Sequence, residues 1–472
     1  MSIMDKLAAN SRIKASATLA ESKLFSDKKM VKTSVPMINV ALSGDIDGGL
    51  SSGLTVLAGP SKHFKTSFGL LIASAYLKEH DDAVILFYDS EFGSPQSYFE
   101  GFGIDTNRVL HTPIMNVEEL KFDLVNQLEN LEVKDKVIIL IDSIGNLASK
   151  KELEDAKSEK SVADMSRAKA LKGLFRMVTP YLTMKDIPLI AINHTYQEIG
   201  LFPKAVVSGG CVVAGTEIQT IDGLKNVEDF NVGEKVITLD GEREVTHVWN
   251  PDTLEDGNPE CYEIEFEDGY TVTCSDKHKF LVNGGWVKAE DLKVGVDVNQ
   301  IENRIMKIAK INKVGKKPVY DLSVKDNEHY ILKNGVVTHN TGIYYSADNI
   351  WIIGRQQEKK GTEIKGYNFI INIEKSRFVR EKSKIPIAVT WEGGIMPYSG
   401  LLEVALEGKY VVKPNIGWYA RVDTETGEVE DKKVREKDTL NKEFWAPVFA
   451  NTDFKDFIKK RFQIGQMSML DD

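Results

Sequence analysis

Four residues at the two ends of one internal block could break and re-form peptide bonds. They are Cys211 and the triplet His339-Asn340-Thr341, and the block that they delimit runs from Cys211 to Asn340. The Cys211 thiol can attack the carbonyl carbon of Gly210, which has no side chain to obstruct it, and convert the amide into a thioester. The Thr341 hydroxyl can then take the acyl group, and Asn340 can cyclise on its own carbonyl while His339 polarises the scissile bond. The block therefore carries the chemistry to excise itself.

Three residues inside the block suit the same chemistry. Ser275 and His278 place a hydroxyl and an imidazole three positions apart, and these groups can donate protons at the first scissile peptide. Asp321, in the run Val319-Tyr320-Asp321-Leu322, offers a carboxyl group that could tune the Cys211 thiol and carry protons between the two ends. We predict that all three residues assist the excision.

Charge and cysteine content also separate the block from the rest of the chain. The block has 15 basic and 24 acidic residues, whereas the rest of the chain, the host, has 45 and 46, so that a nucleic-acid partner is not excluded for the host. Cys211, Cys261 and Cys274 all lie in the block, which leaves the host without a disulfide framework and suits a reducing cytosol. Zinc binding by Cys261, Cys274 and His278 is disfavoured because there is no C-x-x-C pair, and we expect Cys261 and Cys274 to pack as small apolar residues.

A loop near the start of the host has the composition of a phosphate-binding site. An apolar strand at 54–58 leads into this loop, and a helical pattern starts at 67. The loop consists of Gly59, Pro60, Ser61, Lys62, His63, Phe64, Lys65 and Thr66. Backbone N–H groups, a lysine and a hydroxyl at these positions can bind nucleotide phosphates and Mg²⁺, although Phe64 stands where the usual pattern has glycine. The alternative interpretation is an ordinary strand-to-helix turn.

Three more apolar runs, at 83–91, 137–143 and 187–193, carry or lead into the polar residues Glu91, Asp142 and His194. Continuous apolar runs separated by helical stretches indicate parallel strands that are covered on both faces. Asp142 is then placed to hold the water shell of Mg²⁺, and Glu91 to activate an attacking water. Either carboxylate could be a mere cap of its strand, but together with the loop they favour an ATPase with an α/β fold.

The block itself predicts an all-β inserted domain. Turn dipeptides at 222–223, 240–241, 268–269 and 334–335 separate runs that are rich in β-branched residues. Helical periodicity is scarce there. The expected organisation is an N-terminal segment at 1–32, the first part of the ATPase core at 33–210, the inserted domain at 211–340, and the second part of the core with a C-terminal segment at 341–472.

The host resembles the RecA family of strand-exchange proteins, and with Phe64 in its loop it is most similar to the bacteriophage branch, the UvsX type. The segments that carry the resemblance are Tyr88-Asp89-Ser90-Glu91, Leu140-Ile141-Asp142-Ser143, Asn193-His194, and Ser208-Gly209-Gly210 continued by Thr341-Gly342-Ile343. The resemblance implies a RecA-like P-loop ATPase core and an ATP-dependent recombinase of phage recombination, repair and replication. It implies ATP and Mg²⁺ as cofactors, single- and double-stranded DNA as partners, a helical filament, and recombination mediator and single-strand-binding proteins. We expect no membrane partner, because no apolar run reaches the length of a membrane span.

The same resemblance implies roles for individual host residues. Lys65 and Thr66 would bind the phosphates and Mg²⁺ with support from Asp142, Glu91 would activate water, and His194 would sense the γ-phosphate. The loop after His194 would contact DNA, and its candidates are Phe202, Lys204, Gly209 and Gly210. Phe202 could stack between bases, as suits a protein that accepts any sequence.

Lys375 and Arg377 would, by the same resemblance, reach a nucleotide that is held by the neighbouring subunit. The other basic residues of this region, among them Arg355 and Arg380, are more simply a solvated face. The polar stretch from Met4 onward is similar to the segment that docks on an adjacent subunit, with a frayed tail as the alternative. We expect a soluble protein of the cytoplasm of the infected bacterial host, because neither a signal peptide nor an apolar run of membrane-spanning length is seen.

The block resembles a mini-intein, that is, a HINT domain. The matching features are Cys211 at its start, Ser275-Asp276-Lys277-His278, Val319-Tyr320-Asp321-Leu322, and the ending Asn334-Gly335-Val336-Val337-Thr338-His339-Asn340. The resemblance implies autocatalytic splicing. His329 directly precedes Tyr330, one position away from the usual histidine of inteins, and receives no role. Two alternatives stay open: a helicase-type motor with a RecA fold, and a recombinase with a permanent β insertion.

Overall fold

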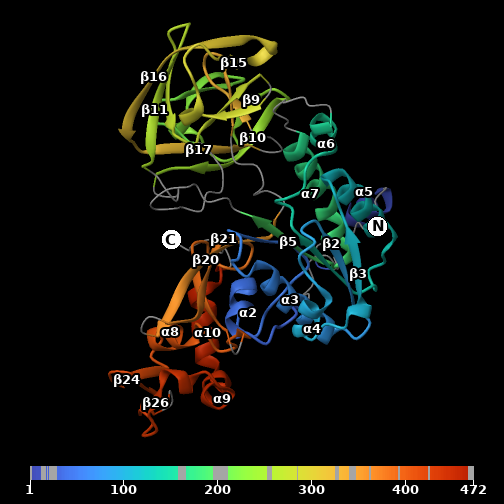
Figure 1. The fold of residues 1–472 in the computed structure, drawn as a ribbon, viewed down its shortest axis with the longest axis vertical. Helices are drawn as coiled ribbons and strands as arrows, with labels where there is room; N and C mark the ends of the chain where they lie inside the picture. The colour runs from blue at the N-terminus through green and yellow to red at the C-terminus, as the bar shows by residue number, and fades with distance from the viewer. Residues whose placement is uncertain are drawn as a thin grey trace.

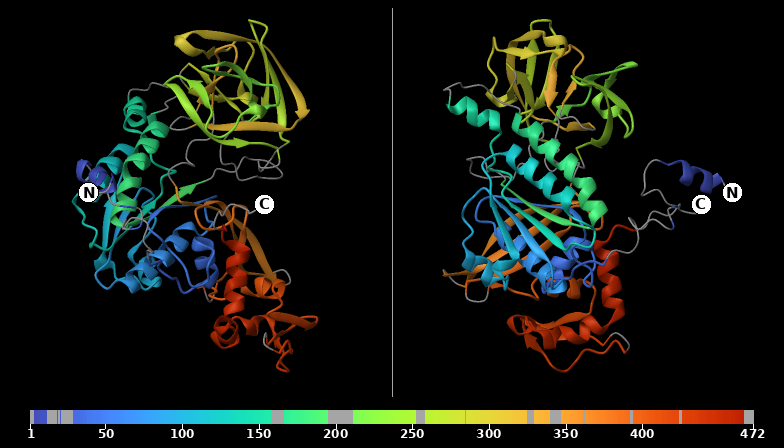
Figure 2. Two further views of the ribbon diagram at one scale, coloured as in Figure 1. Left: turned by 180° about the vertical axis from the view of Figure 1, so that it is seen from behind. Right: turned by 90° about the vertical axis from the view of Figure 1, so that its right-hand side faces the viewer.

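The computed structural model describes most of the chain. The described residues are 3–11, 18, 20, 29–157, 166–194, 211–251, 258–283, 285–324, 329–339, 347–360, 363–391, 394–423 and 426–465. The host, the block 211–340 (from here on the insert) and a C-terminal unit that starts at α8 (Leu401–Glu407) can each be followed along the ribbon in Figure 1. The insert lies at one end of the molecule and the C-terminal unit at the other (Figures 1 and 2).

A nine-stranded sheet forms the centre of the host, in the order β23-β22-β21-β20-β1-β5-β4-β2-β3. Its strands before the insert are β1 (Gly53–Gly59), β2 (Val84–Asp89), β3 (Val109–Pro113), β4 (Val137–Asp142) and β5 (Pro188–His194). Those after it are β20 (Asn349–Lys360), β21 (Glu363–Ser376), β22 (Lys384–Thr390) and β23 (Gly394–Ile395). The strands from β20 to β3 run parallel, and β21 to β23 are added in antiparallel fashion.

The insert separates two strands that share one neighbour. Strand β1 pairs with β5, the last described strand before the insert, and on its other edge with β20, the first described strand after it. The register runs from Thr55 beside Asn349 to Ala58 beside Ile352 on one edge, and from Gly53 beside Pro188 to Gly59 beside His194 on the other. Both parts of the host are therefore joined in one sheet while the insert is present.

Helices cover both faces of the central strands of this sheet and bury them. All seven residues of β1 and all six of β4 are buried. Successive β1 side chains alternate between two cores: Leu57 packs with α2 (Pro36–Ser43) and α3 (Lys65–Glu79), whereas Val56 and Ala58 pack with α5 (Val117–Asn130) and α7 (Ser166–Lys185). Three shorter helices complete the described part before the insert: α1 (Ile3–Asn10), α4 (Gln96–Gly101) and α6 (Lys150–Lys157).

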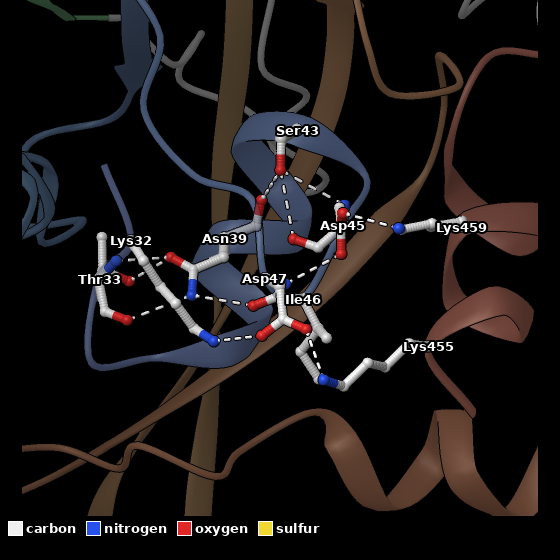
Figure 3. Close-up of polar contacts among 9 residues, drawn as sticks. All are labelled: Lys32, Thr33, Asn39, Ser43, Asp45, Ile46, Asp47, Lys455 and Lys459. Atoms are coloured by element: carbon white, nitrogen blue, oxygen red, sulfur yellow. Dashed lines mark hydrogen bonds and ion pairs between the residues drawn. The ribbon is translucent and has the colours of Figure 1, made fainter. Parts of the chain in front are cut away.

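The C-terminal unit contains helices and a three-stranded sheet, and its last described helix returns to the host. Its elements are α8 (Leu401–Glu407), β24 (Val411–Asn415), β25 (Trp418–Arg421), β26 (Val434–Arg435), α9 (Lys442–Ala450) and α10 (Thr452–Phe462). Lys455 and Lys459 of α10 form ion pairs of 2.7 and 3.2 Å with Asp47 and Asp45 in the loop after α2 (Figure 3). Asp47 also forms an ion pair with Lys32, which lies in the segment before α2. The loop after α2 therefore links that segment to α10.

The insert folds as an all-β unit around its own core. The strands of its described part are β6 (Val212–Val213), β7 (Glu217–Thr220), β8 (Gly223–Asn226), β9 (Lys235–Thr238), β10 (Gly241–Trp249), β11 (Glu260–Phe266), β12 (Thr271–Ser275), β13 (Lys279–Val282), β14 (Gly285–Lys288), β15 (Asp297–Asn299), β16 (Ile305–Lys316), β17 (Val319–Val324), β18 (His329–Ile331) and β19 (Val337–His339). Most of them form one twelve-stranded sheet, and β7 and β8 form a separate hairpin. The main core cluster, from Val212 to Val336, contains no host residue among those described.

The predicted fold class is confirmed: an all-β unit is inserted into an α/β protein with a mostly parallel sheet. The four predicted turn dipeptides join β7 to β8, β9 to β10, β11 to β12, and β18 to β19. Some element bounds differ from expectation, since α3 begins at Lys65 and β2 ends at Asp89. No helix in the described part of the chain is long and apolar enough to cross a membrane.

Candidate functional site

Four parallel strands of the host end at one edge of the sheet and bring the predicted polar residues together there. The loop 59–66 follows β1, Glu91 lies just after β2, Asp142 ends β4, and His194 ends β5. This edge is where open α/β sheets usually bind ligands. Gly59 is needed at the start of the loop, because a Cβ atom there would lie 2.8 Å from the carbonyl oxygen of Ile353 in β20.

Phe64 adopts the backbone conformation that the usual glycine would take. Its φ of 63° and ψ of 16° lie in the left-handed region, and it caps the N-terminus of α3. Its ring stacks on Phe369 at 5.2 Å between centroids and meets the edge of Phe68 at 5.7 Å. Thus the departure from the usual motif keeps the local backbone shape, and the side chain is accommodated by an aromatic cluster.

Lys65, His194 and Glu91 form one chain of polar contacts. The buried Lys65 Nζ donates to the carbonyl oxygen of Pro60 at 2.8 Å and lies 3.3 Å from His194 Nδ1. His194 Nε2 is hydrogen-bonded to Glu91 Oε1, and this contact holds the pKa of Glu91 below its ordinary value. Burial lowers the pKa of Lys65 to about 8.

The short turn that carries Glu91 is held by Asp89 at the end of β2. Asp89 Oδ1 accepts from the backbone N–H groups of Glu91 at 3.0 Å and Phe92 at 2.8 Å, and Oδ2 lies 3.2 Å from His111 Nε2. Asp89 is buried. The sequence motif Tyr88-Asp89-Ser90-Glu91 therefore contains a positioning carboxylate as well as the candidate base.

Thr66 and Asp142 lie together as a candidate metal-binding pair. Thr66 Oγ1 donates to Asp142 Oδ2 at 2.7 Å, while Asp142 Oδ1 is buried without a hydrogen-bond partner among the described residues. Burial raises the pKa of Asp142 to about 6. A hydroxyl and a carboxylate with a free oxygen fit the oxygen-rich, partly hydrated coordination that Mg²⁺ prefers.

A cavity of 620 Å³ opens in front of these groups, within the range of small-molecule sites. The residues of 61–66 line it, together with Glu91, Asp142 and His194. Its lining also includes aromatic and cationic residues that sequence reasoning missed: Tyr98, Arg355, Tyr367, Phe369 and Trp391. The rings of Tyr367 and Trp391 meet edge to face at 5.3 Å. Such a wall can hold an aromatic base while the loop 59–66 binds phosphates.

Arg355 is exposed, as expected for a solvated face, and it also makes two contacts with other residues. Its guanidinium lies 4.5 Å from the ring centroid of Tyr367, and its Nη1 donates to the carbonyl oxygen of Lys62 at 3.2 Å. Arg355 lies toward the carboxyl end of a strand that runs parallel to β1, and this position could have marked it as a site residue. The sequence, however, does not reveal that β20 lies beside β1.

Lys375 and Arg377 do not line this cavity. Arg377 forms an ion pair of 2.5 Å with the buried Asp348, and burial lowers the pKa of Lys375. Lys375 lies opposite Ile350, at the part of β20 that is distant from the loop 59–66. Their contact with a nucleotide of a neighbouring subunit stays a prediction.

The first end of the insert contacts Ser275 through backbone and side chain. The backbone nitrogen of Cys211 donates to Ser275 Oγ at 3.2 Å, and the Ser275 nitrogen donates to the Cys211 carbonyl oxygen at 2.8 Å. Cys211 and Ser275 are both buried. The Ser275 hydroxyl therefore lies at the nitrogen of the Gly210–Cys211 peptide, which is the atom that must become an amine when that bond breaks.

The other end of the insert reaches the same turn through Thr338. The hydroxyl of Thr338 in β19 is hydrogen-bonded to Nε2 of His278, which is fully buried. The backbone nitrogen of His278 donates in turn to the Ser275 carbonyl oxygen at 3.0 Å. The turn Ser275–His278 thus joins Cys211 to a residue two positions before Asn340. Sequence reasoning missed Thr338, whose only signal is its place beside His339.

Asp321 lies on the strand beside Cys211. Strand β17 pairs with β6 through Val319 opposite Val213 and Tyr320 opposite Val212, and one further step of this antiparallel register brings Asp321 opposite Cys211. Asp321 is buried, and burial raises the pKa of its carboxyl group well above the ordinary value. Because burial favours the protonated form of this carboxyl group, it suits a proton carrier.

Cys261 and Cys274 are fully buried and free, as expected for small apolar residues. Among the residues that the structure describes, no group of three or more His, Cys, Asp and Glu side chains could hold a metal ion. His329 is also buried, and its Nε2 accepts from the backbone nitrogen of Leu239 at 2.9 Å, which is a structural contact of the insert.

Several predicted residues lie outside the described part of the chain. They are the DNA-loop candidates Phe202, Lys204, Gly209 and Gly210, and the splice-junction residues Asn340 and Thr341. For His339 the structure describes the backbone, which pairs with His329 across β18 and β19.

Comparison with known proteins gives relatives for both parts of the chain. The recombination and repair protein of Enterobacteria phage T4 is 38% identical over 467 residues, covering 98% of this chain and 86% of that protein. Protein RecA of Mycoplasma mycoides is 27% identical over 166 residues, 34% of this chain and 46% of that protein. The family model "Bacteriophage T4, Recombination and repair protein, C-terminal domain" matches residues 398–458.

The insert has relatives of its own. The family model "Pretoxin HINT domain" matches residues 217–346. Among solved structures, the gp41-1 intein is 30% identical and covers 28% of this chain and 100% of that chain, with a TM-score of 0.26. A bacterial intein-like domain from Clostridium thermocellum is 26% identical over 28% of this chain and 98% of its own, with a TM-score of 0.25. The chain belongs to the RecA-related, UvsX-type family of phage recombination and repair proteins and carries an inserted HINT domain of the intein type.

Proposed function

We propose that the host is a DNA-dependent ATPase and recombinase, made as a precursor that splices out the insert. The observation that carries the ATPase is the convergence of the loop 59–66, Glu91 and Asp142 at one edge of the sheet around a 620 Å³ cavity. From the family relationship we propose that this ATPase acts in a filament on single-stranded DNA, which pairs with a homologous duplex and exchanges strands. The cell in which it acts is the infected bacterial host.

The residues that line the cavity have different roles in binding and hydrolysing Mg²⁺–ATP. ATP supplies the phosphoanhydride bond, and Mg²⁺ neutralises its phosphate charge. Lys65 and the backbone N–H groups of the loop bind phosphate oxygens, and Thr66 and Asp142 hold the metal and its water shell. Glu91 orients and deprotonates the attacking water once His194 turns to the γ-phosphate. The aromatic wall around Tyr367 and Trp391 receives the base.

The DNA-binding loop is the part of the host that the insert interrupts. Phe202 and Lys204 precede the splice site, and Gly209-Gly210 and Thr341 become neighbours when the block 211–340 leaves. A stacked aromatic ring, a cation and a glycine backbone suit binding of single-stranded DNA without sequence preference. We therefore propose that the insert keeps the loop inactive until splicing restores it. Lys375 and Arg377 then contact the nucleotide of the next subunit in the filament.

Splicing proceeds through four exchanges of bonds. The Cys211 thiolate attacks the Gly210 carbonyl, and the Cys211 nitrogen leaves as an amine that receives a proton from the group at Ser275 and His278. The Thr341 hydroxyl then attacks the thioester and releases the thiol. The Asn340 side-chain nitrogen attacks its own carbonyl, forms a succinimide and frees the Thr341 amine, assisted by His339. That amine finally attacks the Gly210–Thr341 ester and yields a normal peptide bond.

The structure supports this order of reaction steps because residues near both ends of the insert contact the turn Ser275–His278. Ser275 meets the nitrogen of the first scissile peptide, and His278 is bonded to Thr338 close to the second. The carboxyl group of Asp321, whose pKa is raised by burial, lies on the strand beside Cys211 and can move a proton between the thiol and the amine. Because Ser275, His278 and Asp321 are buried, water has little access to the thioester, and its hydrolysis is limited.

Substitution of both terminal residues of the insert tests splicing. We expect the chain with Cys211→Ala and Asn340→Ala to stay intact at its full length on a denaturing gel, whereas the unsubstituted chain gives two products, the joined host and the released block 211–340. Lys65→Ala, which affects only the nucleotide cavity, serves as control and should still give both products. An unsubstituted chain that persists uncleaved at every pH would contradict splicing.

Removal of the Thr338 hydroxyl should slow the first step. In the Asn340→Ala chain, dithiothreitol cleaves the Gly210–Cys211 thioester, and we expect Thr338→Val to reduce this rate about tenfold because one buried hydrogen bond to His278 is lost. Thr338→Ser keeps the hydroxyl and should cleave at nearly the parent rate. Equal rates for the valine and serine variants would show that the hydroxyl does not act through His278.

The affinity for Mg²⁺–ATP should depend on pH in a bell shape. Asp142 must lose its proton to hold the metal, so affinity rises as the pH passes about 6; Lys65 must keep its proton, so affinity falls above a pH of about 8. Calorimetric titration on both sides of these two values measures both limbs. Lys65→Arg should move the alkaline limb upward and leave the acid limb in place. An affinity that keeps rising well above the pKa of Lys65 in the parent chain would contradict these assignments.

A further inference from the structure

The loop 59–66 contains two residues in a backbone conformation that L-amino acids rarely adopt. Lys62 has a φ of 62° and Phe64 a φ of 63°. Glycine takes this conformation without cost, whereas a bulky aromatic residue keeps it only where its surroundings impose it. A phosphate-binding loop without the usual glycine therefore needs an external support.

The side chain of Phe64 finds that support in Phe369. The two rings are stacked with an interplanar angle of 24°, and Phe369 is almost fully buried in β21. Phe68, in the first turn of α3, meets both rings edge to face, at 5.7 Å from Phe64 and 6.0 Å from Phe369. The ring of Phe64 is thus fixed between the helix that the loop starts and a strand from beyond the insert.

Lys62 is supported at its backbone. Its carbonyl oxygen accepts from Arg355 Nη1 at 3.2 Å, and the guanidinium of Arg355 is itself placed against the ring of Tyr367. In the antiparallel pair of β20 and β21, Arg355 lies opposite Phe369, and Tyr367 lies opposite Gln357. A cation that contacts an aromatic face and donates a hydrogen bond at the same time has little freedom to leave either.

We propose that Phe369 and Arg355 are positioning residues for nucleotide binding: they hold the loop 59–66 in its phosphate-binding shape and replace the freedom of the missing glycine. Both come from the host part that follows the insert, and β20 is already paired with β1 in the unspliced chain. The unspliced precursor should therefore bind nucleotide before it splices. This inference rests on the proposed binding of ATP at this loop.

A double-mutant cycle between Phe64 and Phe369 tests the support. The parent is the full chain kept unspliced by Cys211→Ala and Asn340→Ala, and calorimetry measures its Kd for Mg²⁺–ATP. We expect Phe369→Leu to raise Kd about fivefold when residue 64 is Phe, because the stacked pair is lost while apolar volume is kept. In the Phe64→Gly background the same substitution should change Kd less than about twofold.

General damage to the core would not reproduce this pattern. Loss of the contact between Phe369 and Phe68 acts equally in both backgrounds and cancels in the cycle. Equal losses of affinity with Phe and with Gly at residue 64 would overturn the role of Phe369. A parent that does not bind Mg²⁺–ATP at all would instead contradict the proposed nucleotide site. It would also contradict nucleotide binding by the unspliced precursor.

Arg355→Gln provides a second, independent variant with little risk to folding, since Arg355 is exposed. We expect Kd to rise about threefold, with an unchanged melting temperature. The matched control is Arg435→Gln, which removes a guanidinium 4.0 Å from the ring of Trp418 in the C-terminal unit. A rise in Kd for the control as large as for Arg355→Gln, or no rise for Arg355→Gln, would overturn the role of Arg355.

Discussion

Strand β1 is paired on one edge with the strand that precedes the insert and on the other with the strand that follows it, and the rest of the molecule depends on this double pairing. It gives the loop 59–66 its place between His194 at the end of β5 and the β20–β21 pair. It also means that the whole block 211–340 is accommodated without dividing the sheet. The insert can fold around a separate core because the connection between β5 and β20, and no strand of the host, receives it.

This arrangement separates two properties that a recombinase normally joins. The proposed nucleotide cavity is lined by residues from both parts of the host, by Lys65 and Asp142 before the insert and by Arg355 and Trp391 after it. The proposed DNA-binding loop is interrupted by the insert itself. His194 contacts Lys65 and Glu91, and in the sequence it directly precedes the segment that leads to Cys211. In our account the precursor has a formed ATP site and lacks a formed DNA site, and Thr341 serves first as a splicing nucleophile and then as a loop residue.

Sequence reasoning reached the fold class because continuous apolar strands and paired turn signals are local features. It also placed Lys65, Thr66, Glu91 and Asp142 at one edge, because parallel strands end together. It could not place Arg355 or Thr338, since each reaches its contacts through a part of the chain that is distant in sequence: β20 lies beside β1, and β19 beside the turn at His278. Phe64 breaks the motif in sequence and keeps it in backbone conformation, which only the three-dimensional contact with Phe369 makes intelligible.

The most direct test of the account compares the ATPase of the two forms of the host. The rate of ATP hydrolysis is measured with and without single-stranded DNA, for the spliced protein and for the full chain with Cys211→Ala and Asn340→Ala. We predict that DNA strongly stimulates the spliced protein and leaves the unspliced chain near its basal rate, although both bind Mg²⁺–ATP. Strong stimulation of the unspliced chain would contradict the claim that the insert keeps the DNA-binding loop inactive.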